Sequence, residues 1–149
     1  MAHKDYEIIN AEFSDIVKIY EIIKKYDSSW NLEAVENEIC NNPFSISKCI
    51  FMNNVMCGFI IYWITFDSAT IVQIAVDENY RKLGLGSALM STAIEDLKSR
   101  RVKNVTLEVR VNNLSAISLY EKFGFKNTLI KKNYYQDGTD AIYMIKEVR

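Results

Sequence analysis

The feature that most constrains the fold is a strand that runs through a glycine-containing turn directly into an amphipathic helix. Residues 74–77 end an apolar run, and residues 80–86 form a turn that holds Gly84 and Gly86. After the turn, apolar positions recur at the spacing of a helix that packs one face on a sheet: Leu85, Leu89, Ala93, Ile94 and Leu97. The first N–H groups of such a helix have no partner inside it and carry part of its positive dipole, so they suit an anion such as a pyrophosphate.

The two glycines alone do not establish a phosphate site. An isolated G-x-G more often marks a tight turn into a helix, because glycine adopts backbone angles that other residues avoid. The segment lacks G-x-x-x-x-G-K-[ST], and the third glycine of G-x-G-x-x-G would fall at Leu89. The sequence therefore argues against nucleotide hydrolysis and dinucleotide redox chemistry, and it leaves the role of the turn open.

Hydrophobic periodicity along the rest of the chain predicts a mixed, mostly antiparallel sheet of about seven strands with about four helices, an α/β (α+β) arrangement. The expected strands cover residues 6–10, 44–52, 55–66, 69–76, 102–109, 125–135 and 140–146. The expected helices cover residues 14–26, 32–39, 84–98 and 113–123, with Ser14 and Asn31 as caps of the first two. Turns are expected at Asn53-Asn54, at Asp67-Ser68 and over residues 136–139.

Length and charge narrow the class of protein. A chain of 149 residues supports one hydrophobic core, so residues 1–149 are expected to form a single domain. Eighteen basic against nineteen acidic side chains leave a net charge of −1, and no global basic field attracts nucleic acid or anionic lipid. The longest apolar run, residues 55–66, is shorter than the roughly 20 residues that cross a bilayer and is expected to be a buried strand. The N-terminal residues lack the pattern of a secretory signal, which favours a cytoplasmic location.

Cysteine and histidine usage limits the chemistry. Cys40, Cys49 and Cys57 show no C-x-x-C spacing, and we expect them to be reduced residues in or near the core. His3, the only histidine, lies at the terminus, so neither a histidine-based metal site nor a histidine-dependent triad is expected. A catalytic base would have to be another type of residue.

An acidic residue in a predicted strand and a tyrosine in the following helix are the candidates for proton transfer. In residues 105–109 the side chains alternate, which puts Glu108 on the face opposite the apolar ones. Taken alone, Glu108 indicates a solvent-facing or edge strand somewhat more than a catalytic residue. Asn113 is expected to cap the next helix, with Tyr120 on the same helix face and Gly124 as a left-handed C-cap. Taken alone, Tyr120 would be a core aromatic.

Together these residues resemble the GCN5-related N-acetyltransferase (GNAT) family. Arg81-x-x-Gly84-x-Gly86 is similar to its pyrophosphate loop, and its second cofactor motif resembles Asn113-x-x-Ala116-x-x-x-Tyr120-x-Lys122-x-Gly124-Phe125. The likeness is greater to one branch, the bacterial ribosomal-protein-alanine N-acetyltransferases of the RimI type, through segments 74–77, 107–110, 133–135 and 140–144. The chain departs from this branch at Leu83, where Gln or Gly is usual, and at Ser29, where Pro often precedes the Trp.

The resemblance implies a GNAT fold and direct transfer of an acetyl group from acetyl-CoA to an amine, with no metal. It implies Glu108 as the base and Tyr120 as the acid that protonates the departing thiolate. The residues expected to bind the cofactor are Ile74, Ala75, Val76, Arg81, Lys82, Leu83, Gly84, Leu85, Gly86, Ser87, Asn113 and Tyr120. Trp30, Tyr134 and Tyr135 are candidates for the walls of a slot for a peptide N-terminus, and each has a core-aromatic interpretation of equal weight.

Three hypotheses for the activity remain. The acceptor is the N-terminal α-amine of a protein such as a ribosomal protein beginning with alanine, or a lysine side chain or small amine, or the chain is a catalytically silent CoA-binding sensor. An α-ammonium has a pKa of about 7.7–8.0 and a lysine of about 10.4, so roughly one α-amine in ten but fewer than about one lysine in a thousand is neutral at pH 7. A single glutamate is better suited to removing the proton of an α-ammonium than that of a lysine. The presence of both Glu108 and Tyr120 argues against a catalytically silent sensor. We expect a monomer or weak dimer that contacts a protein N-terminus and neither nucleic acid nor membrane.

Overall fold

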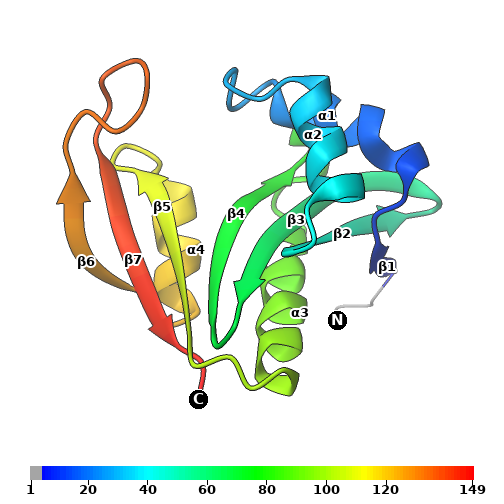
Figure 1. Cartoon of the computed structure of the whole chain (residues 1–149). Helices are drawn as coiled ribbons and strands as arrows, with labels where there is room; N and C mark the ends of the chain where they lie inside the picture. The colour runs from blue at the N-terminus through cyan, green and yellow to red at the C-terminus, as the bar shows by residue number, and fades with distance from the viewer. Residues whose placement is uncertain (1–4) are drawn as a thin grey trace.

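In the computed structural model, which describes residues 5–149, seven strands form a single sheet in the order β1-β2-β3-β4-β5-β7-β6 (Figure 1). Neighbouring strands are antiparallel except for β4 and β5, which are parallel. The prediction of a mixed, mostly antiparallel sheet with four flanking α-helices is therefore confirmed. His3 lies outside the described residues. Within the described part of the chain, every helix is too short or too polar to cross a bilayer.

The observed elements differ from the expected ones mainly at their ends. The strands are β1 Tyr6–Asn10, β2 Ser45–Met52, β3 Val55–Thr65, β4 Ser68–Val76, β5 Asn104–Arg110, β6 Lys126–Lys131 and β7 Ala141–Glu147. The helices are α1 Ile16–Ile23, α2 Leu32–Glu36, α3 Leu85–Ser99 and α4 Leu114–Lys122. Short helical turns cover Phe13–Asp15, Asn37–Asn41 and Glu78–Tyr80.

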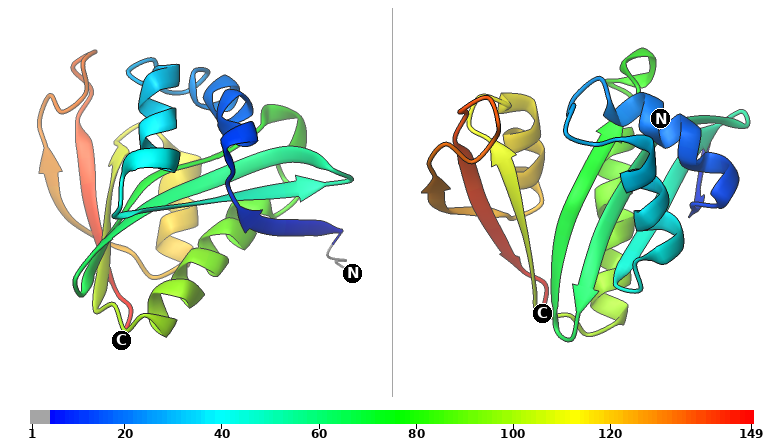
Figure 2. Two further views of the ribbon diagram at one scale, coloured as in Figure 1. Left: turned by 45° about the vertical axis from the view of Figure 1, so that its right-hand side comes forward. Right: turned by 45° about the horizontal axis from the view of Figure 1, so that its top comes forward.

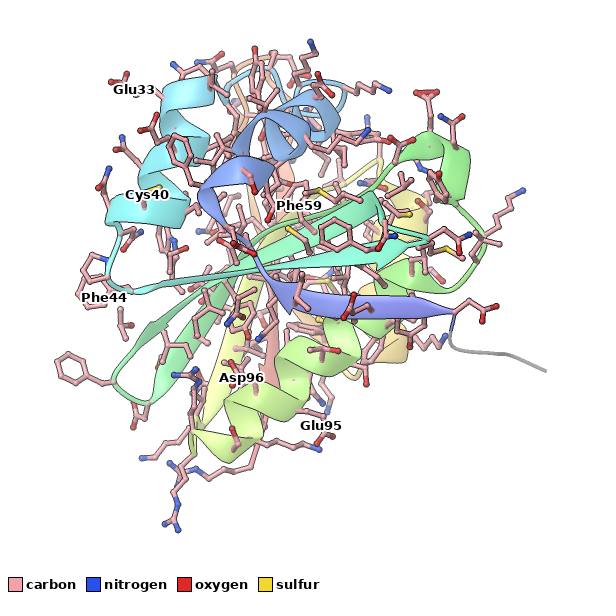
Figure 3. The ribbon with its side chains drawn as sticks, turned by 90° about the vertical axis from the view of Figure 1, so that its right-hand side faces the viewer. Glu33, Cys40, Phe44, Phe59, Glu95 and Asp96 are labelled. Atoms are coloured by element: carbon pink, nitrogen blue, oxygen red, sulfur yellow. The ribbon has the colours of Figure 1, made fainter. Side chains whose placement is uncertain are left out.

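Helices cover both faces of the sheet, and each face has its own hydrophobic core (Figure 2). On one face α3 and α4 supply apolar residues such as Leu89, Leu97 and Tyr120 to a cluster with β3, β5 and β7. On the other face α1 and α2 pack Ile19 and Val35 against β2 and β3. Phe59, labelled in Figure 3, is fully buried in this second cluster. The apolar run that begins at Val55 is a mostly buried strand, as expected, but the strand ends at Thr65 and Phe66 is fully exposed in the turn that follows.

The first helix begins later than predicted, and the prediction of Ser14 as its cap is wrong. Ser14 lies inside the helical turn Phe13–Asp15, and α1 begins at Ile16. The Asp15 carboxylate instead accepts a hydrogen bond from the Glu12 backbone N–H at 2.8 Å. Asn31 does cap α2, accepting a hydrogen bond from the Ala34 N–H at 2.8 Å.

The sixth strand is shorter than predicted. It ends at Lys131, so Tyr134 and Tyr135 lie in the β6–β7 loop and not in a strand. The loop departs from extended geometry at Asn133, whose φ is 51°, and the Asp140 carboxylate accepts the Asn133 N–H at 2.9 Å. The turn between β3 and β4 is also displaced by one residue, because it contains Phe66 with a φ of 57°.

The cysteines agree only in part with expectation. Cys49 and Cys57 are fully buried free thiols, and burial raises the pKa of Cys49 to about 12. Cys40 is exposed, which contradicts its expected place in or near the core; Figure 3 shows it on the outer side of the turn after α2. Cys40 belongs to the helical turn Asn37–Asn41, in which no residue is buried.

The sheet opens between its two parallel strands. β4 pairs with β5 only from Ser68 to Thr70, opposite Asn104 to Thr106, and beyond this point the strands separate (Figure 1). A bulge at Val72 shifts the register of β4 against β3. Gly58 allows β3 to approach β4 closely, because a Cβ at this position would lie 2.6 Å from the Ala75 carbonyl oxygen. The sequence elements around this opening form the candidate site.

Candidate active site

A cleft of about 1190 Å³ occupies the opening between β4 and β5. Its walls come from these two strands, from the connection between α1 and α2, from the start and inner face of α4, and from the β6–β7 loop. Most of the predicted site residues line it: Trp30, Ile74, Ala75, Val76, Arg81, Glu108, Asn113, Tyr120, Tyr134 and Tyr135. The remaining predicted residues, Lys82, Leu83, Gly84, Leu85, Gly86 and Ser87, do not line the cleft and form the turn and first helical residues that follow Arg81.

The start of α3 offers free backbone donors beside the cleft. Gly84 is the N-cap, with a φ of 79° that favours glycine, and its carbonyl accepts the first helical hydrogen bond, from Ala88, at 3.0 Å. The N–H groups of the three residues between them therefore have no partner within the helix. A Cβ on Gly86 would make only ordinary contacts, 3.7 Å from Leu119 and 3.9 Å from Val76. Glycine is thus not required here for packing.

A lysine that the sequence analysis did not assign to the site also faces this helix start. Lys122, at the end of α4, donates a hydrogen bond from Nζ to the Ser87 hydroxyl at 3.4 Å. Its ammonium adds to the positive end of the α3 dipole. Lys122 is part of the second cofactor motif in the sequence, but the motif alone did not indicate that its side chain would reach the start of α3.

Arg81 contacts the segment that follows α1. Its guanidinium lies 4.8 Å from the centre of the Tyr26 ring and donates to the Tyr26 hydroxyl. That hydroxyl donates in turn to the Val76 carbonyl at 3.2 Å. Arg81 thereby connects the end of β4 to the segment after α1, a contact that no local pattern predicted.

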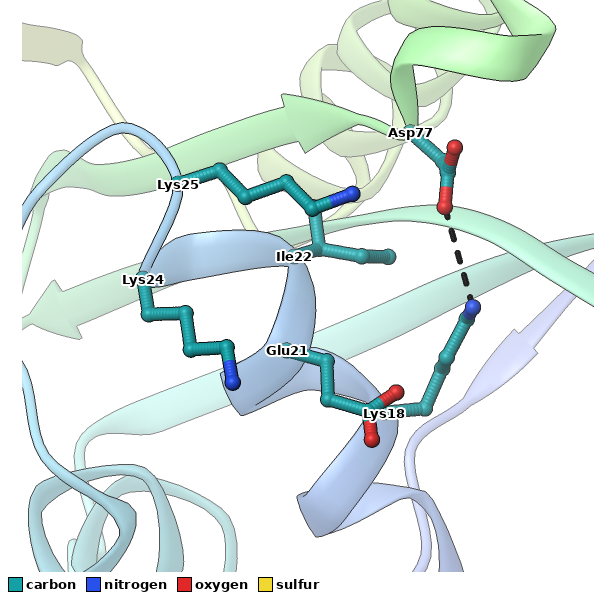
Figure 4. A pocket seen from close by; sticks show the side chains of 6 residues that line it. All are labelled: Lys18, Glu21, Ile22, Lys24, Lys25 and Asp77. Carbon is teal, nitrogen blue, oxygen red and sulfur yellow. Dashed lines mark ion pairs between the residues drawn. The ribbon is translucent and has the colours of Figure 1, made fainter.

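A second connection between α1 and the end of β4 is shown in Figure 4. Lys18 lies 3.6 Å from the carboxylate of Asp77, which is buried, across a small hollow of about 230 Å³. Lys25 pairs with Glu78 at 3.2 Å. These ion pairs hold the turn that precedes α3 against α1, so they position the helix start from the opposite face of the sheet.

Glu108 projects into the cleft from β5. The predicted alternation is confirmed, because Leu107 and Val109 are buried while Glu108 lies on the other face with 24% of its side chain exposed. Its carboxylate accepts a hydrogen bond from the Lys131 ammonium at 2.5 Å. This hydrogen bond raises the pKa of Lys131, which is therefore a cation at neutral pH. Lys131 was not predicted from the sequence, because an ion pair between two strands that are not adjacent leaves no spacing pattern along the chain.

Tyr120 lies between the cleft and the core. The residue is 8% exposed, and its ring packs edge to face on Phe125 with centroids 5.9 Å apart. Burial raises the pKa of Tyr120 above its ordinary value, so its phenol is protonated at neutral pH and can donate a proton or a hydrogen bond. Asn113 caps α4 as predicted, accepting the Ala116 N–H at 3.2 Å.

Aromatic side chains form the other wall of the cleft. The rings of Tyr134 and Tyr135 contact each other edge to face, with their centroids 5.0 Å apart. Trp30 lines the cleft and also packs on the core under α1. Arg110 lies 4.1 Å from the centre of the Tyr135 ring and donates to both carboxylate oxygens of Asp137, at 3.1 and 2.9 Å. Hydrogen bonds from Thr139 and Arg110 lower the pKa of Asp137 to about 2. Neither Arg110 nor Asp137 was predicted as a site residue, although Arg110 lies in the segment 107–110 and Asp137 in the predicted turn 136–139.

Comparisons of the sequence place the chain among known proteins. The profile of the acetyltransferase (GNAT) family matches residues 13–125. A provisionally named ribosomal protein bS18-alanine N-acetyltransferase of Bacillus subtilis (strain 168) is 36% identical over 137 residues, which are 91% of this chain and 91% of that protein. The ribosomal protein bS18-alanine N-acetyltransferase of Escherichia coli (strain K12) is 45% identical over 95 residues, which are 62% of this chain and 64% of that protein.

Solved structures agree with these relatives. The crystal structure of the ribosomal-protein-S18-alanine N-acetyltransferase from Escherichia coli has a TM-score of 0.87 and 33% identity, over 96% of this chain and 94% of that one. A GNAT family acetyltransferase from Elizabethkingia anophelis, solved with acetyl-CoA bound, shares the fold with a TM-score of 0.83 and 21% identity, over 97% of this chain and 99% of that one. The family uses acetyl-CoA. Matched by the family profile over residues 13–125 and by a relative over nine tenths of both chains, this protein belongs to the acetyltransferase (GNAT) family and is an N-acetyltransferase.

Proposed function

We propose that this enzyme transfers the acetyl group of acetyl-CoA to the N-terminal α-amine of a ribosomal protein that begins with alanine. The observation that carries the proposal is the cleft between β4 and β5, which has Glu108 and Tyr120 in its walls and the start of α3 at its end. The names of the Bacillus subtilis and Escherichia coli relatives support this acceptor.

The residues present suit acetyl-CoA. The unpartnered N–H groups at the start of α3, with Lys122 beside them, would hold the diphosphate. Beyond Thr70 the edge of β4 that faces β5 has no strand beside it. Apart from the Val76 carbonyl, which accepts from Tyr26, the backbone groups on this edge from Ile74 to Val76 would align the extended arm of the coenzyme. When bound, acetyl-CoA supplies a carbonyl activated as a thioester.

Glu108 and Tyr120 would handle the two protons of the transfer. As the amine nitrogen bonds to the carbonyl carbon, Glu108 receives the proton that the amine loses. As the carbon–sulfur bond breaks, Tyr120 gives its phenolic proton to the departing sulfur, whose thiol has a pKa of about 8.5. The buried free thiols of Cys49 and Cys57 do not line the cleft, which supports direct transfer without an acyl-enzyme.

The α-amine is the acceptor that this machinery suits best. Its pKa of about 7.7–8.0 leaves roughly one molecule in ten neutral at pH 7, whereas the neutral fraction of a lysine side chain, with a pKa of about 10.4, is roughly 250- to 500-fold smaller. The rings of Tyr134, Tyr135 and Trp30 would enclose the first residues of a peptide and leave its terminal amine near Glu108.

The test compares two peptides with the same sequence, which begins with alanine and contains a lysine. One begins with a free alanine, and the other is blocked at its N-terminus and carries a lysine. We expect one acetyl group on the α-amine of the first and none on the second, located by fragment mass spectrometry. Acetylation of the lysine alone would replace the proposal with a side-chain acetyltransferase, and binding of acetyl-CoA without transfer to any amine would indicate a sensor.

The setting of the enzyme is part of the same proposal. Residues 1–149 would form one domain that acts in the cytoplasm as a monomer or weak dimer, on a protein N-terminus and without direct contact with nucleic acid or membrane. The near balance of basic and acidic side chains, which leaves a net charge of −1, supports a partner that is not a polyanion.

A further inference from the structure

The Lys131 ammonium occupies a site built for a cation. It lies 2.5 Å from the Glu108 carboxylate, 5.3 Å from the centre of the Tyr134 ring and 4.8 Å from the centre of the Tyr143 ring. A carboxylate with two aromatic rings is the set of groups that binds a primary ammonium. These groups come from β5, β7 and the β6–β7 loop, so the sheet and not a local motif assembles the site.

The ion pair of Lys131 and Glu108 has little net negative charge with which to attract a second cation. Glu108 faces the cleft, but its negative charge is balanced by Lys131. The next charged side chain on this face of β5, Arg110, is balanced in turn by Asp137. A second ammonium that approached Glu108 would meet the Lys131 ammonium within a few ångströms, and like charges at that distance disfavour the protonated form of either group.

The Lys131 ammonium and the α-ammonium of an acceptor peptide differ in how readily they lose a proton. The hydrogen bond to Glu108 raises the pKa of Lys131 above its ordinary value, which already exceeds that of an α-ammonium. The incoming α-amine is therefore the group that gives up its charge. Lys131 itself remains protonated and is a poor nucleophile toward the thioester.

We propose that Lys131 is a built-in counter-ion of Glu108 that keeps protonated amines from docking on this carboxylate, so that the acceptor is held as the reactive neutral amine. Lysine side chains and polyamines, which are almost wholly protonated at pH 7, are thereby excluded as unproductive ligands. Lys131 acts through Glu108 and is a positioning residue. The inference rests on the proposed role of Glu108 as the base that faces the acceptor.

The experiment compares wild type with Lys131→Met, Lys131→Arg and Lys126→Met. Arginine keeps the charge, and Lys126 is an exposed lysine on the same strand that serves as the matched control. The first measurement is the dissociation constant of n-butylammonium chloride by NMR titration, at constant ionic strength. We expect Lys131→Met to bind this cation about tenfold more tightly than wild type, which corresponds to about one pKa unit of the bound amine, and the other two variants to bind it as wild type does.

The second measurement is the kinetics with the alanine-initiated peptide. At about pH 7, kcat and KM of Lys131→Met should fall together, with kcat/KM preserved, because the peptide is then held in its unreactive charged form. At about pH 9, where most free α-amines are neutral, the difference from wild type should shrink to about twofold or less.

Two results would overturn the inference. One is an unchanged affinity for n-butylammonium in Lys131→Met. The other is a loss of kcat/KM that is equal at both pH values and is not restored in Lys131→Arg, which would mean that Lys131 merely orients Glu108. If no α-amine is acetylated at all, the proposed function fails, while tighter binding of n-butylammonium to Lys131→Met would still support the counter-ion.

Discussion

The two sides of the cleft are built in different ways. The proposed cofactor side consists mainly of one continuous segment, β4 followed by the turn and the start of α3, with Lys122 of α4 beside it, and it offers mainly backbone groups. The acceptor side consists of side chains from segments far apart in the sequence, among them Trp30, Glu108 and Tyr134. A backbone-built half depends on local conformation, whereas a half built from side chains depends on ion pairs and ring contacts between elements. The first should tolerate most substitutions outside its glycines, and the second should be sensitive to single side chains.

The largest expected difference between the two sides comes from Glu108→Gln, which should impair the acceptor side and leave the cofactor side intact. Loss of the base should lower turnover at pH 7 by about 10²–10⁴-fold. Acetyl-CoA binding, measured by calorimetry, should change little, because the groups proposed to hold the coenzyme are on β4, α3 and α4 and not on β5. Equal losses of turnover and of binding would contradict the role of Glu108 as base.

Tyr120→Phe tests the residue where the two sides meet. Removal of the phenolic proton donor should lower turnover by roughly 10–100-fold, while the Phe ring keeps the contact with Phe125. The thermal unfolding midpoint should stay close to that of wild type, as measured by circular dichroism. If the variant unfolds, Tyr120 is a packing residue and the acid lies elsewhere.

A matched glycine pair tests the cofactor side. Gly86→Ala should weaken acetyl-CoA binding by about tenfold with normal stability, because the added methyl group makes only ordinary contacts within the protein but obstructs the diphosphate. Gly84→Ala should lower the free energy of unfolding by about 1–2 kcal/mol, because its φ of 79° strains any other residue while space is open around it. Calorimetry and denaturant unfolding separate the two effects. Normal coenzyme affinity in Gly86→Ala would place the diphosphate elsewhere.

The smallest expected effect concerns the loop on the acceptor side. Asp137→Asn removes the ionic partner of Arg110 at an exposed position, so KM for the peptide should rise by roughly two- to fivefold with kcat unchanged. In the folded protein the pKa of Asp137 is lowered to about 2, so the pair is present above about pH 4 and is lost as the pH falls toward 2. Steady-state kinetics between about pH 6 and pH 8 should therefore show a pH-independent ratio of variant to wild type. A loss in kcat instead of KM would assign the pair a role in the chemistry.

The sequence was most informative where structure depends on neighbours along the chain. Asn31 and Asn113 cap helices as predicted, because each side chain reaches an N–H group three residues ahead. Ser14 is also a residue type that caps helices, but it does not cap α1. The Asp15 carboxylate instead accepts the hydrogen bond from the Glu12 N–H at the start of this helical stretch. The predicted end of β6 was also wrong, since Tyr134 and Tyr135 are typical of strands, but the backbone leaves the strand and turns at Asn133.

By itself, the sequence determined the order of the elements, the family, and the motifs at residues 74–87 and 113–125, because these depend on short-range periodicity and on glycine and Asx geometry. Only the tertiary structure decided where β4 and β5 part, that Arg81 turns to Tyr26, and that Lys131 neutralises Glu108. These features join residues that are tens of positions apart. Their energies come from charge and ring contacts through space, and no spacing along the chain encodes such contacts.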